Sequence, residues 1–164
     1  MAIEFTHEKG WKQGLYDLIH PEKYIGDKNK IVYRSAWEKE MHKFLDNNPN
    51  IIQWCSEPFA IPYVKPTDGE VHRYFPDYYI KYKDKYGKIH EEIVEVKPRS
   101  QRILREGASR AEVVDYYVNQ AKWKYAKAWC DAHGLTFSVM SERPDASNRH
   151  NFRKRKIRKI RARR

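Results

Sequence analysis

The order of helical and extended patterns predicts an α/β fold in which helices flank a mixed central sheet. Three observations support this class: a helical stripe follows Ser35, three strand-like stretches lie between residues 51 and 97, and a long helical pattern precedes one last strand. The resulting order is αβββαβ. At 164 residues the chain is long enough for one sizeable core. We expect an N-terminal extension, one α/β domain and a basic C-terminal arm, at residues 1–33, 34–142 and 143–164.

The composition limits which classes of protein and which cellular location we expect. No apolar run approaches the roughly 18 residues that span a bilayer, so we expect no membrane partner. The first residues have no basic region followed by an apolar one, so we expect no secretory signal. Cys55 and Cys130 are too few for a disulfide framework or a Cys-based zinc site, and the seven histidines show no metal-ligand spacing. A reducing cytoplasm is the expected location.

The N-terminal extension has little periodicity, and we expect it to pack on the core. One short helix is expected there, ended at Pro21, with an apolar face formed by Trp11, Leu15, Leu18 and Ile19.

The helix after Ser35 has clear boundaries. Ser35 is a candidate N-cap, and Glu38 follows it at the spacing of a capping box. Asn47-Asn48-Pro49 ends the helix. Its expected buried stripe consists of Trp37, Met41, Phe44 and Leu45.

Three strand-like stretches follow this helix. Residues 51–63 favour one strand, or two short ones broken at Pro58. Residues 71–82 and 89–97 favour the second and third strands, and the polar loop between them contains Gly87. These last two strands are expected to form a β-hairpin.

A loop at residues 98–110 leads to the longest helix, expected at residues 111–133, with Gly134 as its C′ residue. A last strand is expected at residues 135–140. The buried stripe expected on this helix consists of Val114, Val118, Ala121, Tyr125 and Trp129, with Tyr117 and Ala128 at its edges.

The third strand carries two candidate active-site residues, Glu95 and Lys97. Because side chains alternate along a strand, Glu95 and Lys97 share one face, while Val94 and Val96 point to the other. Asp77 opens the partner strand and is expected to lie level with them. Two carboxylates and a strand carbonyl form the all-oxygen site that Mg²⁺ or Mn²⁺ prefers. The alternative is that Pro76-Asp77 is a turn and that Glu95 and Lys97 form a solvated pair.

Glu38 has two competing roles in this scheme. It either bonds back to the start of its own helix or reaches the carboxylates at Asp77 and Glu95. Helical geometry does not decide between them, and Glu40 borders the same apolar stripe from its other side.

Basic residues indicate a nucleic-acid partner. The net charge of +11 comes from the end of the chain, because residues 149–164 hold ten Lys or Arg and no acid, which leaves 23 bases against 22 acids elsewhere. Such a run favours phosphate binding, although a solubilising tail or one that binds acidic protein or lipid is the alternative. The expected DNA contacts are Arg99, Arg102, Arg105, Lys122, Arg153, Lys154, Arg155, Lys156, Arg158, Lys159 and Arg161.

The motif Pro-Asp followed by Glu-x-Lys resembles the PD-(D/E)XK nuclease superfamily. A longer set of segments is similar to the head-completion nuclease of large contractile-tailed bacteriophages, a family related to the heteromeric transposase endonuclease subunit. The likeness runs from about Tyr24 to Met140. Its segments are Tyr24-Ile25-Gly26-Asp27, Ile31-Val32-Tyr33-Arg34-Ser35-Ala36-Trp37-Glu38, Glu57-Pro58-Phe59, Phe75-Pro76-Asp77-Tyr78 and Glu95-Val96-Lys97-Pro98.

This resemblance implies a restriction-endonuclease-like core and a catalytic set of Glu38, Asp77, Glu95 and Lys97 with Mg²⁺. Asp77, Glu95, the Val96 carbonyl and Glu38 are the implied metal ligands. The implied reaction is hydrolysis of double-stranded DNA, endo- or exonucleolytic, late in phage head assembly, before the tail joins. The implied location is the host cytoplasm during assembly, or the head–neck region of the virion. Phage portal, neck or head proteins are the implied protein partners.

Two other functions stay open from the sequence. The protein could be a structural DNA-binding assembly factor with a vestigial nuclease site. It could also be a transposase-type or repair-type endonuclease that uses the same residues. Plasmid cleavage with Mg²⁺ and with a chelator separates the first of these from an active nuclease.

Overall fold

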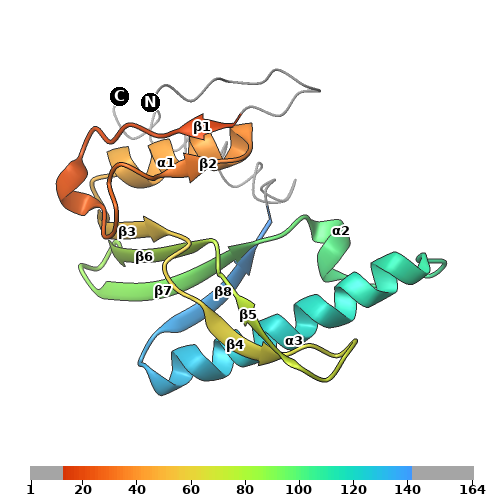
Figure 1. The fold of residues 1–164 in the computed structure, drawn as a ribbon. Helices are drawn as coiled ribbons and strands as arrows, with labels where there is room; N and C mark the ends of the chain where they lie inside the picture. Colours follow the sequence, from red (N-terminus) through yellow and green to blue (C-terminus); the bar gives the residue numbers. More distant parts are fainter. Residues whose placement is uncertain (1–12, 142–164) are drawn as a thin grey trace, which may run out of the picture.

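The computed structural model describes residues 13–141, and its centre is a four-stranded mixed sheet (Figure 1). The strand order is β3-β6-β7-β8, in which β7 and β8 are parallel and the other neighbours antiparallel. The predicted fold class is confirmed, because α1, three sheet strands, α3 and β8 follow one another along the chain. The sheet strands are β3 (Ile51–Ser56), β6 (Tyr78–Lys83), β7 (Ile89–Val96) and β8 (Thr136–Met140).

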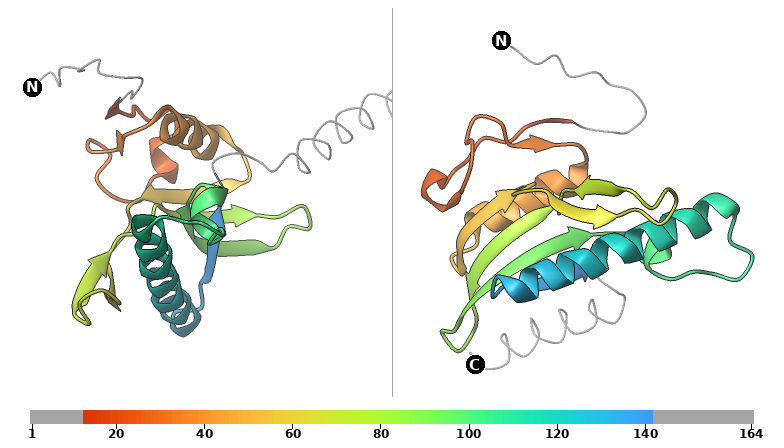
Figure 2. Two further views of the ribbon diagram at one scale, coloured as in Figure 1. Left: turned by 90° about the vertical axis from the view of Figure 1, so that its right-hand side faces the viewer. Right: turned by 60° about the horizontal axis from the view of Figure 1, so that its bottom comes forward.

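Each face of the sheet has its own apolar cluster. Helix α1 (Ala36–Asn47) and the N-terminal segment cover one face, while α3 (Arg110–Ala132) covers the other (Figures 1 and 2). Trp54 and Tyr78 belong to the first cluster. Because β7 is covered on both faces, its last four residues are all buried.

The predicted hairpin of β6 and β7 is present, with Tyr78 opposite Val94 in the register. The predicted strand at residues 71–82 is wrong in one respect, because it is two strands separated at residues 75–77. Pro76 cannot donate to a strand ladder, and the backbone turns there. Of the two alternatives for residues 51–63, two short strands is correct.

Because the chain breaks after β3 and again before β6, an additional hairpin is inserted between these two strands. Strands β4 (Ile61–Val64) and β5 (Val71–Tyr74) pair with each other in a separate two-stranded sheet, which lies between β3 and β6 in the chain. The hairpin packs beside α3, where Ile61, Tyr63 and Tyr74 form the second apolar cluster with Ala126 (Figure 2).

The N-terminal segment packs on the core as expected, but the predicted short helix is wrong in the residues that the structure describes. Strands β1 (Gly14–Leu15) and β2 (Val32–Tyr33) pair instead, and a 3₁₀ turn, η1, spans Pro21–Lys23. Leu15 and Ile19 are exposed, and Leu18 packs only partly against the core. The core residues of this segment are Tyr16, Tyr24, Ile31 and Tyr33. Trp11 lies outside the described residues.

Helix α1 begins as predicted, since the Ser35 hydroxyl accepts a hydrogen bond from the Glu38 N–H at 3.1 Å. The second half of the predicted capping box differs. The Glu38 carboxylate accepts from the Arg34 N–H, one residue before the cap. Within the predicted stripe, Leu45 is buried and Trp37 and Met41 are partly buried against the core, but Phe44 is exposed.

The inner face of α1 is more polar than predicted. His42 and Asp46 are buried there. The Asp46 carboxylate accepts hydrogen bonds from the Tyr16 hydroxyl and from the backbone N–H groups of Ile19 and His20. One buried carboxylate therefore attaches the N-terminal segment to the helix.

The second half of the chain departs from prediction in the expected loop, whereas α3 lies within one residue of its predicted bounds. The expected loop contains a short helix, α2 (Arg99–Arg102), and α3 begins at a capping box formed by Ser109 and Glu112. Gly134, at φ +70°, follows the helix as predicted. No helix within residues 13–141 has the length and apolarity to cross a bilayer.

The predicted apolar stripe of α3 is only partly correct. Val118, Ala121 and Trp129 pack on the second cluster. The helix is rotated so that the buried positions are Asn119, Ala126 and Cys130. The predicted members that are exposed are Val114, Tyr117, Tyr125 and Ala128.

Candidate active site

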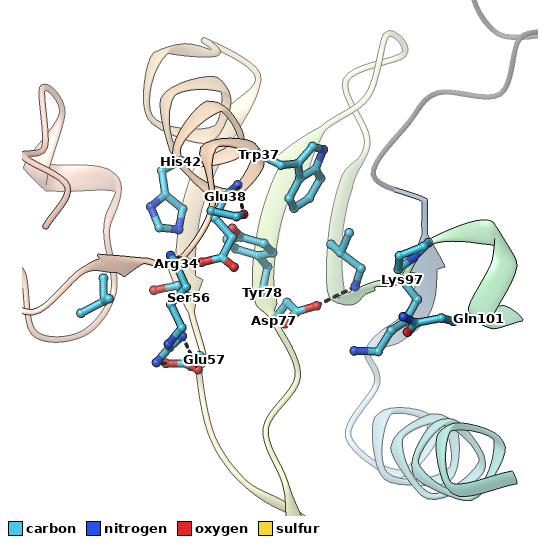
Figure 3. Close-up of a pocket in the computed structure, with 14 residues that line it drawn as sticks. Arg34, Trp37, Glu38, His42, Ser56, Glu57, Asp77, Tyr78, Lys97 and Gln101 are labelled. Atoms are coloured by element: carbon cyan, nitrogen blue, oxygen red, sulfur yellow. Dashed lines mark hydrogen bonds and ion pairs between the residues drawn. The ribbon is translucent and has the colours of Figure 1, made fainter. Parts of the chain in front are cut away.

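A pocket of about 380 Å³ lies between α1 and the end of β7 (Figure 3). Glu38 enters it from α1, Asp77 from the bend before β6, and Lys97 from the end of β7. The fold thus brings together three of the four predicted catalytic residues, which are separated along the chain. Tyr78 and Gln101 contribute further to the lining.

Asp77 is held at both its backbone and its side chain. Its carboxylate accepts a hydrogen bond from the Val96 N–H at 2.7 Å, and its carbonyl accepts one from the Glu57 N–H at 2.9 Å. Glu57 has a φ of +47°, an uncommon conformation for a residue with a side chain. The bend at Asp77 is therefore fixed by the strands on either side of it.

The Asp77 carboxyl group lies in an environment that disfavours its charge. Burial raises its pKa above the ordinary value, and the negative charge of Glu95 raises it further. The hydrogen bond from Val96 and the positive charge of Lys97 act in the opposite direction. Two carboxylates therefore repel each other in a partly dry site.

Glu95 and Lys97 lie on the same face of β7, as their alternation predicts. The Lys97 ammonium is 3.0 Å from Oε1 of Glu95. The other oxygen of Glu95, Oε2, accepts a hydrogen bond of 2.7 Å from the Tyr74 hydroxyl. The Glu95 side chain is only 3% exposed and that of Lys97 is 28% exposed, so the pair is buried on its carboxylate side and is not a fully solvated surface pair.

Glu38 fulfils the first of its two predicted roles, since its Oε2 accepts a hydrogen bond of 2.7 Å from the Arg34 N–H. It also lines the pocket, where Figure 3 shows its carboxylate on the side of Asp77 opposite Lys97. The Arg34 guanidinium binds both oxygens of Glu57, at 3.0 and 3.3 Å. The exposed ion pair of Arg34 and Glu57 thus forms part of the pocket rim.

The donor chemistry of the pocket fits a hard divalent cation. Asp77 and Glu95 offer carboxylate oxygens whose mutual repulsion a cation would relieve. The predicted cluster of Glu38, Asp77 and Glu95 does not converge on one point, however. Within residues 13–141, no three His, Cys, Asp or Glu side chains come together to hold an ion. Glu38 bonds to Arg34, and both Glu95 oxygens already have donors.

The predicted basic residues lie in different environments. Arg99 and Arg102 are on α2, and Arg102 donates a hydrogen bond to the Ser141 hydroxyl. Arg105 lines a separate hollow between α2 and α3. Lys122 lies over the rings of Tyr63 and Tyr74, 5.8 Å from each centroid. The remaining predicted contacts lie outside the described residues: Arg153, Lys154, Arg155, Lys156, Arg158, Lys159 and Arg161.

The Lys122 ammonium belongs to the environment of Glu95. Burial lowers the pKa of Lys122, and the charge of Lys97 lowers it further, whereas Glu95 raises it. Two ammonium groups, Lys97 and Lys122, therefore act electrostatically on one buried carboxylate.

Three residues near the pocket were missed by sequence reasoning. Tyr74 binds Glu95 from the inserted hairpin. Arg34 and Glu57 form the rim pair. Glu95 and Glu57, the glutamates in these contacts, belong to the segments that resemble the nuclease family. Nothing in the local sequence, however, links Tyr74 to a carboxylate 21 residues later.

A mixed sheet that presents an acidic pair and a lysine at the ends of neighbouring strands defines a nuclease-like protein. Residues 48–142 match the family model described as TnsA-like endonuclease N terminal, and the chain belongs to this family. The matched range includes Asp77, Glu95 and Lys97 but not Glu38.

The chain is also similar to the head completion nuclease of Enterobacteria phage T4, with 37% identity over 130 residues. The alignment covers 73% of this chain and 84% of the relative. The resemblance to head-completion nucleases inferred from the motifs is thus confirmed. No solved structure matches the chain.

Proposed function

We propose that this protein is a divalent-metal-dependent deoxyribonuclease that cuts phosphodiester bonds of double-stranded DNA during completion of a phage head. The observation that carries the proposal is the convergence of Asp77 and Lys97 on one pocket, with Glu95 beside them, in a chain of an endonuclease family. The similarity to a head completion nuclease supports the assignment to phage assembly.

The proposed biological role goes further than the chemistry. The nuclease processes packaged DNA ends before head–tail joining, in the cytoplasm of the infected host, next to portal, neck or head proteins. The relative named head completion nuclease supports this setting.

Asp77 and Glu95 would hold the Mg²⁺ or Mn²⁺ ion, with the Val96 carbonyl as a third ligand and Glu38 as a further one. When bound, the ion supplies Lewis acidity to a phosphate oxygen and lowers the pKa of a bound water. The other proposed catalytic contribution comes from Lys97. The Lys97 ammonium, which lines the pocket, stabilises negative charge that develops on the phosphate or orients the attacking water.

The proposal is tested by incubating supercoiled plasmid with the full chain, with Mg²⁺ and with EDTA. Asp77→Ala and Lys97→Ala are each expected to lower the rate of plasmid cleavage by at least about 100-fold. Because a covalently closed plasmid has no ends, its cleavage also shows endonucleolytic action. Thermal unfolding of each variant checks that the fold is intact.

Matched controls make the same chemical changes on the surface. Asp131→Ala and Lys81→Ala each remove one member of an ion pair outside the pocket. Both variants should cut like the unaltered chain. Full Mg²⁺-dependent cleavage by Asp77→Ala or Lys97→Ala would rule out the assigned site.

A second candidate function is a DNA-binding scaffold with a vestigial nuclease site. The observation in its favour is the open cluster, since no three acidic or His/Cys side chains within residues 13–141 converge on one point. Tight plasmid binding with no cleavage in Mg²⁺ or Mn²⁺ would support this function. Chelator-sensitive cleavage would exclude it.

A further inference from the structure

Tyr74 makes a buried polar contact to the candidate active site. Its hydroxyl donates a 2.7 Å hydrogen bond to Oε2 of Glu95, and the two residues are 4% and 2% exposed. Tyr74 is the last residue of β5, on the hairpin inserted between β3 and β6. It therefore reaches Glu95 from outside the central sheet.

We propose that Tyr74 is a positioning residue that holds the Glu95 carboxylate in the orientation needed to bind a divalent cation. The inference rests on the proposed function, because it gives Glu95 the role of a metal ligand. It assigns a task to the β4–β5 hairpin, which otherwise contributes apolar packing against α3.

The physical basis is the cost of a buried carboxylate without donors. Removing one partner of a buried charged group leaves it unpaired, which costs more than an ordinary hydrogen bond contributes. Tyr74 holds Oε2, while Lys97 holds Oε1. Of these two contacts, the one from Tyr74 comes from a rigid aromatic side chain within an apolar cluster, so it restricts the rotation of the carboxylate about its axis.

The surroundings keep the Tyr74 hydroxyl a donor. Because an ionised carboxylate can only accept, the 2.7 Å contact with Oε2 of Glu95 requires the Tyr74 hydroxyl to donate. The Lys122 ammonium lies over the Tyr74 ring and the Tyr63 ring, which clamps the aromatic pair against α3. Residues that orient a metal ligand in this way commonly change metal affinity about 10-fold to 100-fold when they are replaced.

The direct test measures Mn²⁺ binding to the full chain by isothermal titration calorimetry, without DNA. Tyr74→Phe removes the donor and keeps the ring, and it should weaken Mn²⁺ binding by about 10-fold. Tyr63→Phe is the matched control. It removes a hydroxyl from the other tyrosine beneath Lys122, in the same hairpin, and should leave the affinity within about 2-fold of the unaltered chain.

A double-mutant cycle separates positioning from general packing. If Tyr74 acts through Glu95, adding Tyr74→Phe to a Glu95→Gln chain should not weaken Mn²⁺ binding further. An equal loss in both backgrounds would mean that Tyr74 does not act through this carboxylate, and would overturn the inference.

The remaining outcomes also decide the matter. Unchanged Mn²⁺ affinity in Tyr74→Phe overturns the inference and leaves the proposed nuclease intact. No Mn²⁺ binding by the unaltered chain ends both. If Tyr74→Phe does not fold, the double variant with Glu95→Gln should fold again, because the unpaired buried charge is then absent. A double variant that stays unfolded would show that Tyr74 supports the core and not the carboxylate.

Discussion

At the scale of single residues, His42 is an unexpected member of the pocket lining. It is 1% exposed, packs between the rings of Tyr16, Trp54 and Tyr78, and its Nδ1 has no hydrogen-bond partner within residues 13–141. Burial lowers the pKa of His42 to about 4. The folded protein therefore keeps this imidazole neutral under conditions in which the unfolded chain protonates it.

The first prediction concerns the pH dependence of stability. Between pH 6.5 and pH 4 the unfolded state binds more protons at His42 than the folded state, so the free energy of unfolding falls as the pH is lowered. This residue alone should remove about 2 kcal/mol between pH 7 and pH 5. Urea unfolding of the unaltered chain and of His42→Leu at both pH values measures the difference.

The Leu variant has no group that titrates at this position and a similar volume. Its unfolding free energy should therefore fall less than that of the unaltered chain over the same pH range, by about 2 kcal/mol. An identical fall in both proteins would mean that His42 is not held neutral by the fold.

Residues of the candidate site differ in how far the sequence could predict them. Glu95 and Lys97 were placed together because strand alternation is strictly local, and the hairpin register then brings Asp77 level with them. Tyr74 and His42 could not be predicted in the same way. Their partners come from distant segments, and both positions appear in the sequence as ordinary members of a strand and a helix.

At the scale of elements, the errors come from apolar residues on more than one side of a helix. Phe44 on α1 and Tyr117 on α3 fit the helical period but face solvent. Asp46 and Asn119 occupy buried positions instead. Periodicity gives the existence of a helix correctly, but tertiary packing decides which side faces the sheet, and a polar residue can be buried when it has donors or acceptors.

The N-terminal segment illustrates this point through Asp46. We predict that Asp46→Ala lowers the free energy of unfolding by about 3 kcal/mol, because it leaves the hydroxyl of Tyr16 and the N–H groups of Ile19 and His20 without their acceptor. Asp131→Ala, which removes an exposed pair with Lys127, should cost less than about 0.5 kcal/mol.

Equilibrium urea unfolding gives both values. Limited proteolysis adds a local measurement, since the segment before α1 should be cut sooner in Asp46→Ala than in Asp131→Ala. Equal stability of the two variants would show that the N-terminal segment is held mainly by its apolar residues, such as Tyr24 and Ile31.

At the scale of the whole molecule, most of the net positive charge lies in a different part of the sequence from the candidate active site. The pocket that carries the carboxylates belongs to the described domain, whereas ten of the 33 basic residues fall in residues 149–164. Without them the chain is nearly neutral, with 23 bases and 22 acids. We therefore propose that the nearly balanced body relies on the basic run at residues 149–164 for long-range attraction to DNA.

This separation predicts that deleting residues 149–164 changes DNA binding more than it changes chemistry. Each phosphate contact that is lost lowers the slope of log affinity against log salt by about 0.9, so the dependence on NaCl should flatten by several such steps. Fluorescence anisotropy with a labelled duplex at 50 to 200 mM NaCl measures the slope. Single-turnover cleavage at saturating protein and low salt should stay within about 3-fold of the full chain, because Asp77, Glu95 and Lys97 are retained.

The matched comparison keeps the arm and changes Arg99, Arg102 and Arg105 to Gln. These residues lie on or beside α2, next to the pocket, so their loss should slow single-turnover cleavage more than the arm deletion does while lowering the salt slope less. If the arm deletion leaves the slope unchanged, the arm does not touch DNA, and the result would favour the alternatives of a solubilising tail or of binding to acidic protein or lipid.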